Sequence, residues 1–121
     1  GKYTATTTFA AGDHRTYNRA GEAFDRGETF SGVDFEVGLQ AASRLAASLP
    51  SDVSLPAASL AWIASRPGIT SVIPGARSVA QARANADAAA LLSAGFDLDG
   101  FDAVVRQVYD DLLRAAIHNH W

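Results

Sequence analysis

The hydrophobic positions recur at helical spacing in several stretches, which predicts a mainly α-helical chain with about four helices. Residues 31–66 are expected to hold two of them. The first covers 33–47, with Ser31 and Asp34 as candidates for its N-cap and Pro50 beyond its end. Its inward face is formed by Val37, Ala41, Leu45 and Ala46.

The second of these helices begins after Ser54, which is a further N-cap candidate. Pro56 lies in its first turn, where the missing N–H of proline costs nothing. Leu60 and Ile63 face inward, and the sequence Arg66-Pro67-Gly68 ends the helix.

A short β-branched stretch at 70–73 follows and is the one convincing strand in the sequence. A single strand leaves its backbone N–H and C=O groups without partners. We therefore expect 70–73 either to pair with another chain or to lose its strand character.

Ser78 and Gln81 have the spacing of a capping box and predict a third helix over 78–92. This helix is rich in alanine, which favours helix formation. Because it follows a strand and the turn Pro74-Gly75, its first turn is a candidate anion site, where free N–H groups and the helix dipole attract phosphate. Arg77 adds a permanent positive charge in a forked geometry that suits phosphate.

A fourth helix is predicted over 97–116, capped by Asp97 or Asp99. It has the clearest amphipathic stripe in the chain, formed by Phe101, Val104, Val105, Val108 and Leu112. Residues 1–30 fit neither a helical nor a strand period and are expected to form a long loop. Aromatic residues along this loop predict that it packs against other parts of the protein.

The chain of 121 residues has a formal net charge of −3, which favours neither nucleic acid nor an anionic membrane as a partner. It contains no cysteine, so a disulfide framework and a thiol nucleophile are excluded. No apolar run is long enough to span a membrane, and we expect a soluble, cytoplasmic protein. Since the chain starts at Gly1 and contains no methionine, we also expect it to be a piece of a longer protein.

The three histidines, His14, His118 and His120, do not form a metal-binding pattern, because no acidic residue has helical spacing to any of them. Asp13 precedes His14, but the pair is not a catalytic triad without a placed nucleophile. We therefore predict no metal site from these residues.

Read together, Ile73-Pro74-Gly75-Ala76-Arg77-Ser78, Gln81, Asn85 and the opening Gly1-Lys2-Tyr3 resemble the C-terminal part of an aldo-keto reductase. In particular, the chain is similar to the branch that includes bacterial general-stress reductases and potassium-channel β subunits. The resemblance implies an NADP-dependent (β/α)8 TIM barrel, of which 1–121 is a single partial domain. Residues 1–30 would be the loop after strand seven, 70–73 strand eight, 78–92 helix eight and 97–116 the C-terminal helix.

The same resemblance implies roles toward NADP for individual residues. Gly75 and Arg77 would lie at the adenosine 2′-phosphate, with Gln81 beside it. Asn85 would face the adenine amino group, and Lys2 would reach the pyrophosphate.

The chain departs from the family's pattern at several positions. Many members have an acidic residue immediately before the asparagine, where this chain has Ala84. Another branch has lysine in the turn and arginine at the position of Gln81, so Arg77 must supply most of the positive charge here. The family's catalytic Asp, Tyr, Lys and His come from motifs that this sequence does not contain. Its tyrosines at 3, 17 and 109 do not match the catalytic motif, and we expect no hydride transfer by the chain alone.

Each of these residues also has a simpler explanation that involves no cofactor. Arg77 and Lys2 are also explained as solvated side chains. Gln81 and Asn85 are also explained as a helix cap and an exposed polar residue. Arg15 lies in a loop that crosses the cofactor in some relatives.

Two classes of function remain open from the sequence. The first is the NADP-adenosine-binding segment of an aldehyde/ketone oxidoreductase, whose partners are NADP(H) and a carbonyl substrate through the complete barrel. Such a segment would pair with the missing N-terminal part or self-associate. The second is a non-enzymatic helical interaction module or an inactive truncated product.

Overall fold

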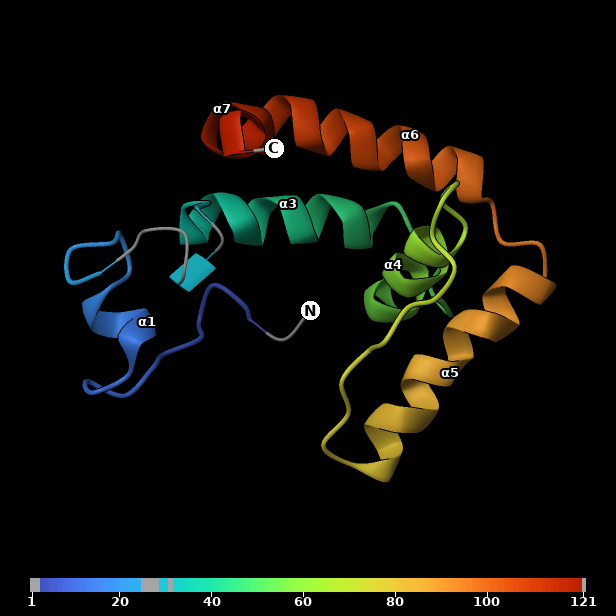
Figure 1. Cartoon of the computed structure of the whole chain (residues 1–121), viewed down its shortest axis with the longest axis horizontal. Helices are drawn as coiled ribbons and strands as arrows, with labels where there is room; N and C mark the ends of the chain where they lie inside the picture. Colours follow the sequence, from blue (N-terminus) through green and yellow to red (C-terminus); the bar gives the residue numbers. More distant parts are fainter. Residues whose placement is uncertain (1–2, 25–28, 31, 121) are drawn as a thin grey trace. The chain divides into compact units, whose positions relative to one another are not determined.

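In a computed structural model of the chain, the residues described are 3–24, 29–30 and 32–120. Their regular structure is helical, and this part of the chain contains no strand (Figure 1). The α-helices are α1 (His14–Tyr17), α3 (Phe35–Ala47), α4 (Leu55–Ala64), α5 (Val79–Ser93), α6 (Leu98–Val108) and α7 (Arg114–Ile117). A π-helix (Tyr109–Leu113) joins α6 to α7, and a 3₁₀-helix (His118–His120) follows. None of the described helices is long and apolar enough to cross a membrane.

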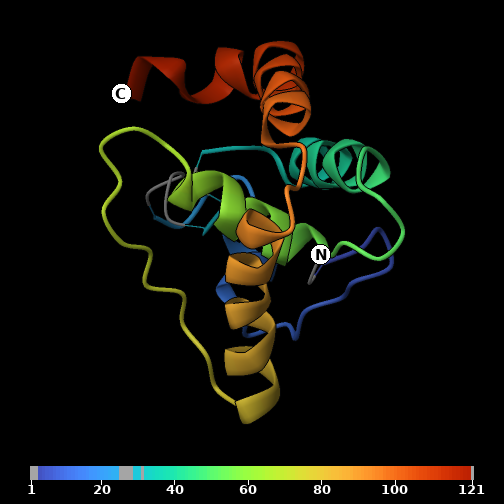
Figure 2. The same cartoon turned by 90° about the vertical axis from the view of Figure 1, so that its right-hand side faces the viewer.

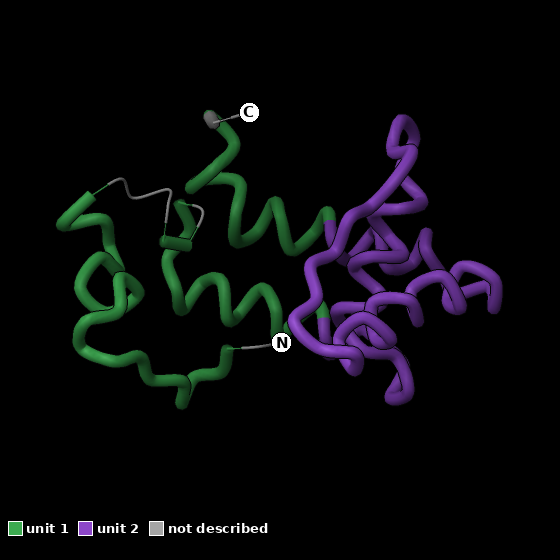
Figure 3. Tube along the Cα trace, turned by 60° about the horizontal axis from the view of Figure 1, so that its bottom comes forward, with its two compact units in different colours: residues 1–45, 106–121 green, residues 46–105 purple. Residues whose placement is uncertain are grey.

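The chain divides into two compact units (Figure 3). The first contains residues 1–45 and 106–121, and the second contains residues 46–105. Each unit has its own buried side chains and its own internal hydrogen bonds.

The four helices predicted from the sequence are present, and polar caps set where they begin. Asp34 caps α3, since its Oδ1 accepts hydrogen bonds from the N–H groups of Glu36 (2.9 Å) and Val37 (3.3 Å). The other candidate for this cap, Ser31, lies outside the described residues. Ser54 caps α4, its side chain accepting from the Ala57 N–H at 3.3 Å.

The fourth predicted helix, over 97–116, is interrupted. Asp97 supplies its cap, because Oδ1 of Asp97 accepts from the Gly100 N–H at 2.9 Å. Phe101 and Val108 of the predicted stripe are buried. The prediction of one continuous α-helix was wrong, because the Arg114 N–H bonds back to the Tyr109 carbonyl, five residues earlier. A bond of this reach adds a residue to the turn and marks the π-helical segment.

Residues 1–30 were predicted as loop throughout, and this was wrong at α1. Asp13 caps this single turn by accepting from the Arg15 N–H at 2.9 Å. A helix of four residues is too short to show an apolar period, so the sequence pattern could not reveal it.

An aromatic cluster forms much of the interior of the first unit, as the loop's aromatic residues predicted. Phe35 is buried, and its ring lies 5.0 Å from that of Phe30, 6.0 Å from that of Phe9 and 6.3 Å from that of Tyr3. Aromatic ring pairs in contact stabilise a fold beyond the contribution of the apolar area that they bury. The C-terminal segment joins the same unit, because Arg44 of α3 donates to Asp111 at 2.9 Å.

Asn18 is fully buried and organises the loop that follows α1. Its Oδ1 accepts from the N–H groups of Ala23 (2.8 Å) and Phe24 (3.0 Å). Its Nδ2 donates to the Thr29 hydroxyl at 3.0 Å. A buried amide needs such partners, because a buried donor or acceptor without a hydrogen bond costs about 1–3 kcal/mol of stability.

In the second unit α4 and α5 pack against each other through alanines. Ala57, Ala58 and Ala61 of α4 and Ala88 of α5 are buried. Trp62 and Arg66 on one side of this unit both donate to Asp102, at 2.8 and 2.7 Å.

The predicted strand at 70–73 is absent, which corrects the expected fold. These residues lie in the long loop between α4 and α5 (Figure 2), and Ile73 is 93% exposed. The physical reason is the one given above, since a strand without a neighbour has no ladder to stabilise it. The second of the two outcomes expected for 70–73, loss of strand character, is the one observed. The correspondence of the segments to barrel elements stays a prediction.

Candidate cofactor site

The candidate site is built on the start of α5, where Ser78 is the N-cap. Its backbone is extended, with φ −148° and ψ 158°, and its hydroxyl accepts from the Gln81 N–H at 3.2 Å. This is the first half of the predicted capping box. The N–H groups of the first turn that no cap uses are available to a ligand, and the helix dipole favours a negative one.

The second half of the capping box differs from the usual form. The side-chain carbonyl of Gln81 reaches past Ser78 and accepts from the Arg77 N–H at 2.7 Å. One helical turn later, the Asn85 side-chain amide donates to the Gly75 carbonyl at 3.2 Å. The two amides therefore hold the turn 75–77 against the first two turns of α5.

The structure thus brings together four of the residues that the sequence singled out: Gly75, Arg77, Gln81 and Asn85. All four are solvent-exposed or half-buried, so a ligand can reach them. A Cβ at Gly75 would meet no atom within 4 Å. Gly75 has no positive φ in this structure, so its value to a site lies in the open space beside its backbone.

Arg77 contributes a free charge. Among the described residues its guanidinium makes no hydrogen bond and no ion pair, and only its backbone N–H is engaged. A cation beside a helix N-terminus opposes the helix dipole slightly, so the position is not explained by stability.

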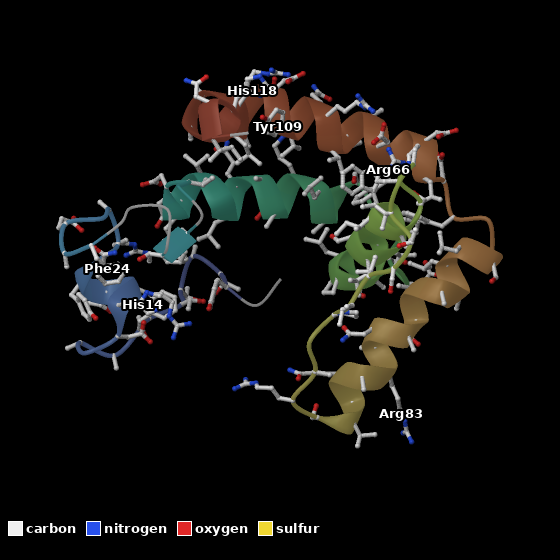
Figure 4. The ribbon with its side chains drawn as sticks, in the orientation of Figure 1. His14, Phe24, Arg66, Arg83, Tyr109 and His118 are labelled. Carbon is white, nitrogen blue, oxygen red and sulfur yellow. The ribbon has the colours of Figure 1, made fainter. Side chains whose placement is uncertain are left out.

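Arg83 provides a comparison on the same helix. Its guanidinium also has no partner among the described residues, and it projects from α5 away from the loop that enters the helix (Figure 4). Arg83 lies two residues after Gln81, about 200° around the helix, and so on the opposite face.

A model of the aldo/keto reductase family matches residues 2–102, most of the chain, including the turn and α5. The chain belongs to the aldo/keto reductase family. No curated protein and no solved structure matches it significantly. The family prediction is therefore confirmed, while the branch within the family is not tested. Membership indicates an oxidoreductase parent, a nicotinamide nucleotide as its cofactor and a carbonyl substrate.

One further residue, Lys2, was expected to contact the cofactor of an aldo/keto reductase, and Arg15 was noted in a loop that crosses the cofactor in some relatives. Lys2 lies outside the described residues, and its role stays a prediction. Arg15 is engaged within the loop, because its guanidinium binds the Asp13 carboxylate and donates to the Tyr3 hydroxyl at 2.6 Å. It also lies 4.5 Å from the centre of the Phe9 ring.

These contacts change the acid–base properties of the pair. The hydrogen bonds from Arg15 hold the pKa of the Asp13 carboxyl well below its usual range. The hydrogen bond to Asp13, and then that to Tyr3, raises the pKa of Arg15 above its already high value. Arg15 therefore stays charged, and its charge is compensated by Asp13 within the first unit of the aldo/keto reductase chain.

Two further side-chain contacts can be followed at the residues labelled in Figure 4. His14 lies beside Phe24, with ring centres 6.2 Å apart. Tyr109 hydrogen-bonds to Nδ1 of His118 at 2.8 Å. The described residues contain no group of three potential metal ligands, and the side chain of His120 is outside them.

The sequence did not reveal the backbone groups that complete the site. The carbonyl of Gly75 and the N–H of Arg77 bind the two amide side chains, and every residue type has such groups. The capping-box spacing of Ser78 and Gln81 was the only available signal for this part of the turn.

Proposed function

We propose that the chain is the C-terminal, NADP-adenosine-binding segment of an NADP-dependent aldehyde/ketone oxidoreductase. The observation that carries this proposal is the turn 75–78 at the start of α5 in a chain of this family. Among the residues that the structure describes, the side chain of Arg77 and the first-turn N–H groups that no cap uses have no partner there.

The physical chemistry of this turn suits the adenosine 2′-phosphate. A phosphate next to the N-terminus of α5 gains from the helix dipole and from the N–H groups of the first turn. Arg77 adds a charge-assisted contact, and the phosphate would in turn remove the unfavourable interaction between Arg77 and the dipole. Open space at Gly75 lets the ligand approach the backbone.

The preference for NADP over NAD follows from the same groups, because only NADP carries the 2′-phosphate. Hydride transfer needs the catalytic residues of the family, and this sequence contains no motif that matches them. We therefore expect the chain to bind the adenosine end of the cofactor and not to reduce a carbonyl compound alone.

Calorimetric titration of the chain with NADP and with NAD tests the proposal. We expect NADP to bind more tightly, and Arg77→Ala to weaken NADP binding by about tenfold to a hundredfold, because a hydrogen bond to a charged group is worth about 1.5–3 kcal/mol. The matched control is Arg83→Ala, which removes the same charge from the opposite face of α5. It is expected to leave NADP binding unchanged.

Equal losses in the two variants would mean non-specific attraction, and unchanged binding in both would remove Arg77 from the site. If NADP does not bind at all, the non-enzymatic alternative stands.

A further inference from the structure

We infer that residues 69–73 are a self-association surface, through which two copies of the chain pair as antiparallel β-strands about a two-fold axis at Ser71. The segment lies in the loop between α4 and α5 (Figure 2), within the second unit. The inference is independent of the proposed function, because the pairing uses neither the cofactor nor any residue assigned to it.

The backbone of this segment has the form of an unpaired strand. Residues 69–76 run without a turn or a bend. Within the described part of the chain, residues 70–73 make no hydrogen bond. Three of these four residues are exposed, and Val72 is half-buried. An extended segment whose N–H and C=O groups lack partners is a template for a second strand.

The side chains of the segment lack the features that protect an exposed strand from pairing. Ile73 is 93% exposed and Ile69 is 44% exposed. No charged residue lies between Arg66 and Arg77, although charged side chains are a common protection of strand edges. The segment therefore offers an uncharged, β-branched surface that suits another strand of the same character.

The order of the residues identifies the partner as a second copy of the same segment. In an antiparallel pair centred on Ser71, Ile69 lies opposite Ile73 of the second copy. On the other face, Thr70 lies opposite Val72 of the second copy. Cross-strand pairs of β-branched and apolar side chains are the contacts that stabilise a sheet. The two-fold axis repeats each pair, so one patch serves both copies, as an isologous interface requires.

The hydrogen bonds already present in the chain decide which backbone groups pair. The N–H of Ile69 donates to the Arg66 carbonyl at 3.1 Å, so a ladder through Ile69 would have to break this bond. The N–H and C=O groups of Thr70 and Val72 are not used by the described residues. The bonds between copies therefore fall to these two residues, each exchanging two hydrogen bonds with the other in the second copy. The N–H of Ser71 then points away from the second copy.

The association is expected to be weak and to depend on protein concentration, because a short two-stranded ribbon is a small interface. Sedimentation velocity of the whole chain, at concentrations up to ~1 mM, measures it. We expect a monomer at the lowest concentrations and a dimer at the highest.

Two proline variants test the assigned hydrogen bonds. Val72→Pro removes the N–H of Val72 from both copies, and so two of the four bonds of the ladder. We expect it to weaken the association at least fivefold. The matched control is Ser71→Pro, which removes an N–H that points away from the second copy and is expected to leave the dimer in place. Circular dichroism of each variant checks that the helices are retained.

A cysteine at position 71 tests the register. The chain contains no cysteine, so Ser71→Cys introduces a single thiol. Across the two-fold axis the Cα atoms of position 71 would lie ~4.5 Å apart, within the range of a disulfide. We expect mild oxidation to give a covalent dimer. The control is Ala76→Cys, which is exposed in the same loop but lies far from its copy in this register, and we expect it to cross-link much more slowly.

The outcomes separate this inference from the proposed function. A chain that stays monomeric at every concentration would overturn the inference and leave the proposed function standing. Equal weakening by the two prolines, or equal cross-linking of the two cysteines, would mean that the copies meet elsewhere and would also overturn it. A chain that forms the dimer but does not bind NADP would overturn only the proposed function.

Discussion

Replacing Asp102 is expected to destabilise the second unit more than removing an exposed ion pair does. One oxygen of Asp102, Oδ1, accepts from Trp62 Nε1 at 2.8 Å and from Arg66 Nη1 at 2.7 Å. The guanidinium of Arg66 also lies 4.9 Å from the centre of the Trp62 ring. The side chains of Arg66 and Asp102 are 27% and 17% exposed, so water replaces these contacts poorly.

The magnitude follows from the two hydrogen bonds. Asp102→Ala removes two hydrogen bonds to a charged carboxylate, each worth about 1.5–3 kcal/mol. It also leaves the half-buried guanidinium of Arg66, whose Nε already has no hydrogen-bond partner within the described part of the chain. Because both groups keep some access to water, we expect a loss of about 2–3 kcal/mol in the free energy of unfolding. Asp102→Asn retains one oxygen for both donors but loses the charge and replaces the second oxygen by an NH₂ group, so a smaller loss of about 1 kcal/mol is expected.

Urea unfolding of each variant, followed by far-UV circular dichroism and by hydrogen exchange of the amides in α4 and α6, measures these differences. The control is Asp110→Ala, which removes an ion pair to Arg114 whose side chains are about half exposed (54% and 49%). A pair of this kind contributes about 0.3–0.5 kcal/mol. The reasoning would be refuted if Asp102→Ala cost no more than Asp110→Ala, or if Asp102→Asn cost as much as Asp102→Ala.

Two further predictions concern the first unit. Asn18→Ala leaves two loop N–H groups without their acceptor, so we expect a loss of about 2–3 kcal/mol and faster hydrogen exchange at the Phe24 amide; unchanged exchange there would contradict this. The hydrogen bonds from Arg15 lower the pKa of Asp13 in the folded state. The stability that their contact contributes is therefore complete above the ordinary Asp pKa of ~3.9, and it is lost only as the pH falls through the lower pKa of the folded state. In NMR spectra the Arg15 Nε–H signal is therefore expected to persist at pH ~3, and its loss between pH ~5 and ~4 would show that the two side chains are not paired.

The helices could be predicted from the sequence because their signals are local. Ser54 and Ser78 stand at the start of α4 and α5 with the cap contacts that their positions predicted. Phe101 and Val108 fall on the stripe that predicted the C-terminal helix, and both are buried. In each case the residues that decide the structure lie within about two turns of one another.

Contacts between distant segments could not be predicted in the same way. Trp62 and Asp102 are 40 residues apart, and neither has a neighbour whose spacing points to the other. The strand at 70–73 failed for a related reason. Its β-branched residues suit a strand, but strand formation depends on a second segment, and none pairs with it among the described residues.

The candidate site shows why the choice between a cap and a ligand group could not be made from the sequence. An amide has two ends, and at Gln81 and Asn85 one end of each binds the turn while the other has no partner in the described part of the chain. A structural role for these residues therefore supports a binding role, because the turn holds the free ends in place. Arg77 differs from both, since its side chain does nothing for the described part of the fold and slightly opposes the helix dipole. A ligand anion would explain its position, which is why Arg77→Ala, compared with Arg83→Ala, is the most informative substitution for the proposed function.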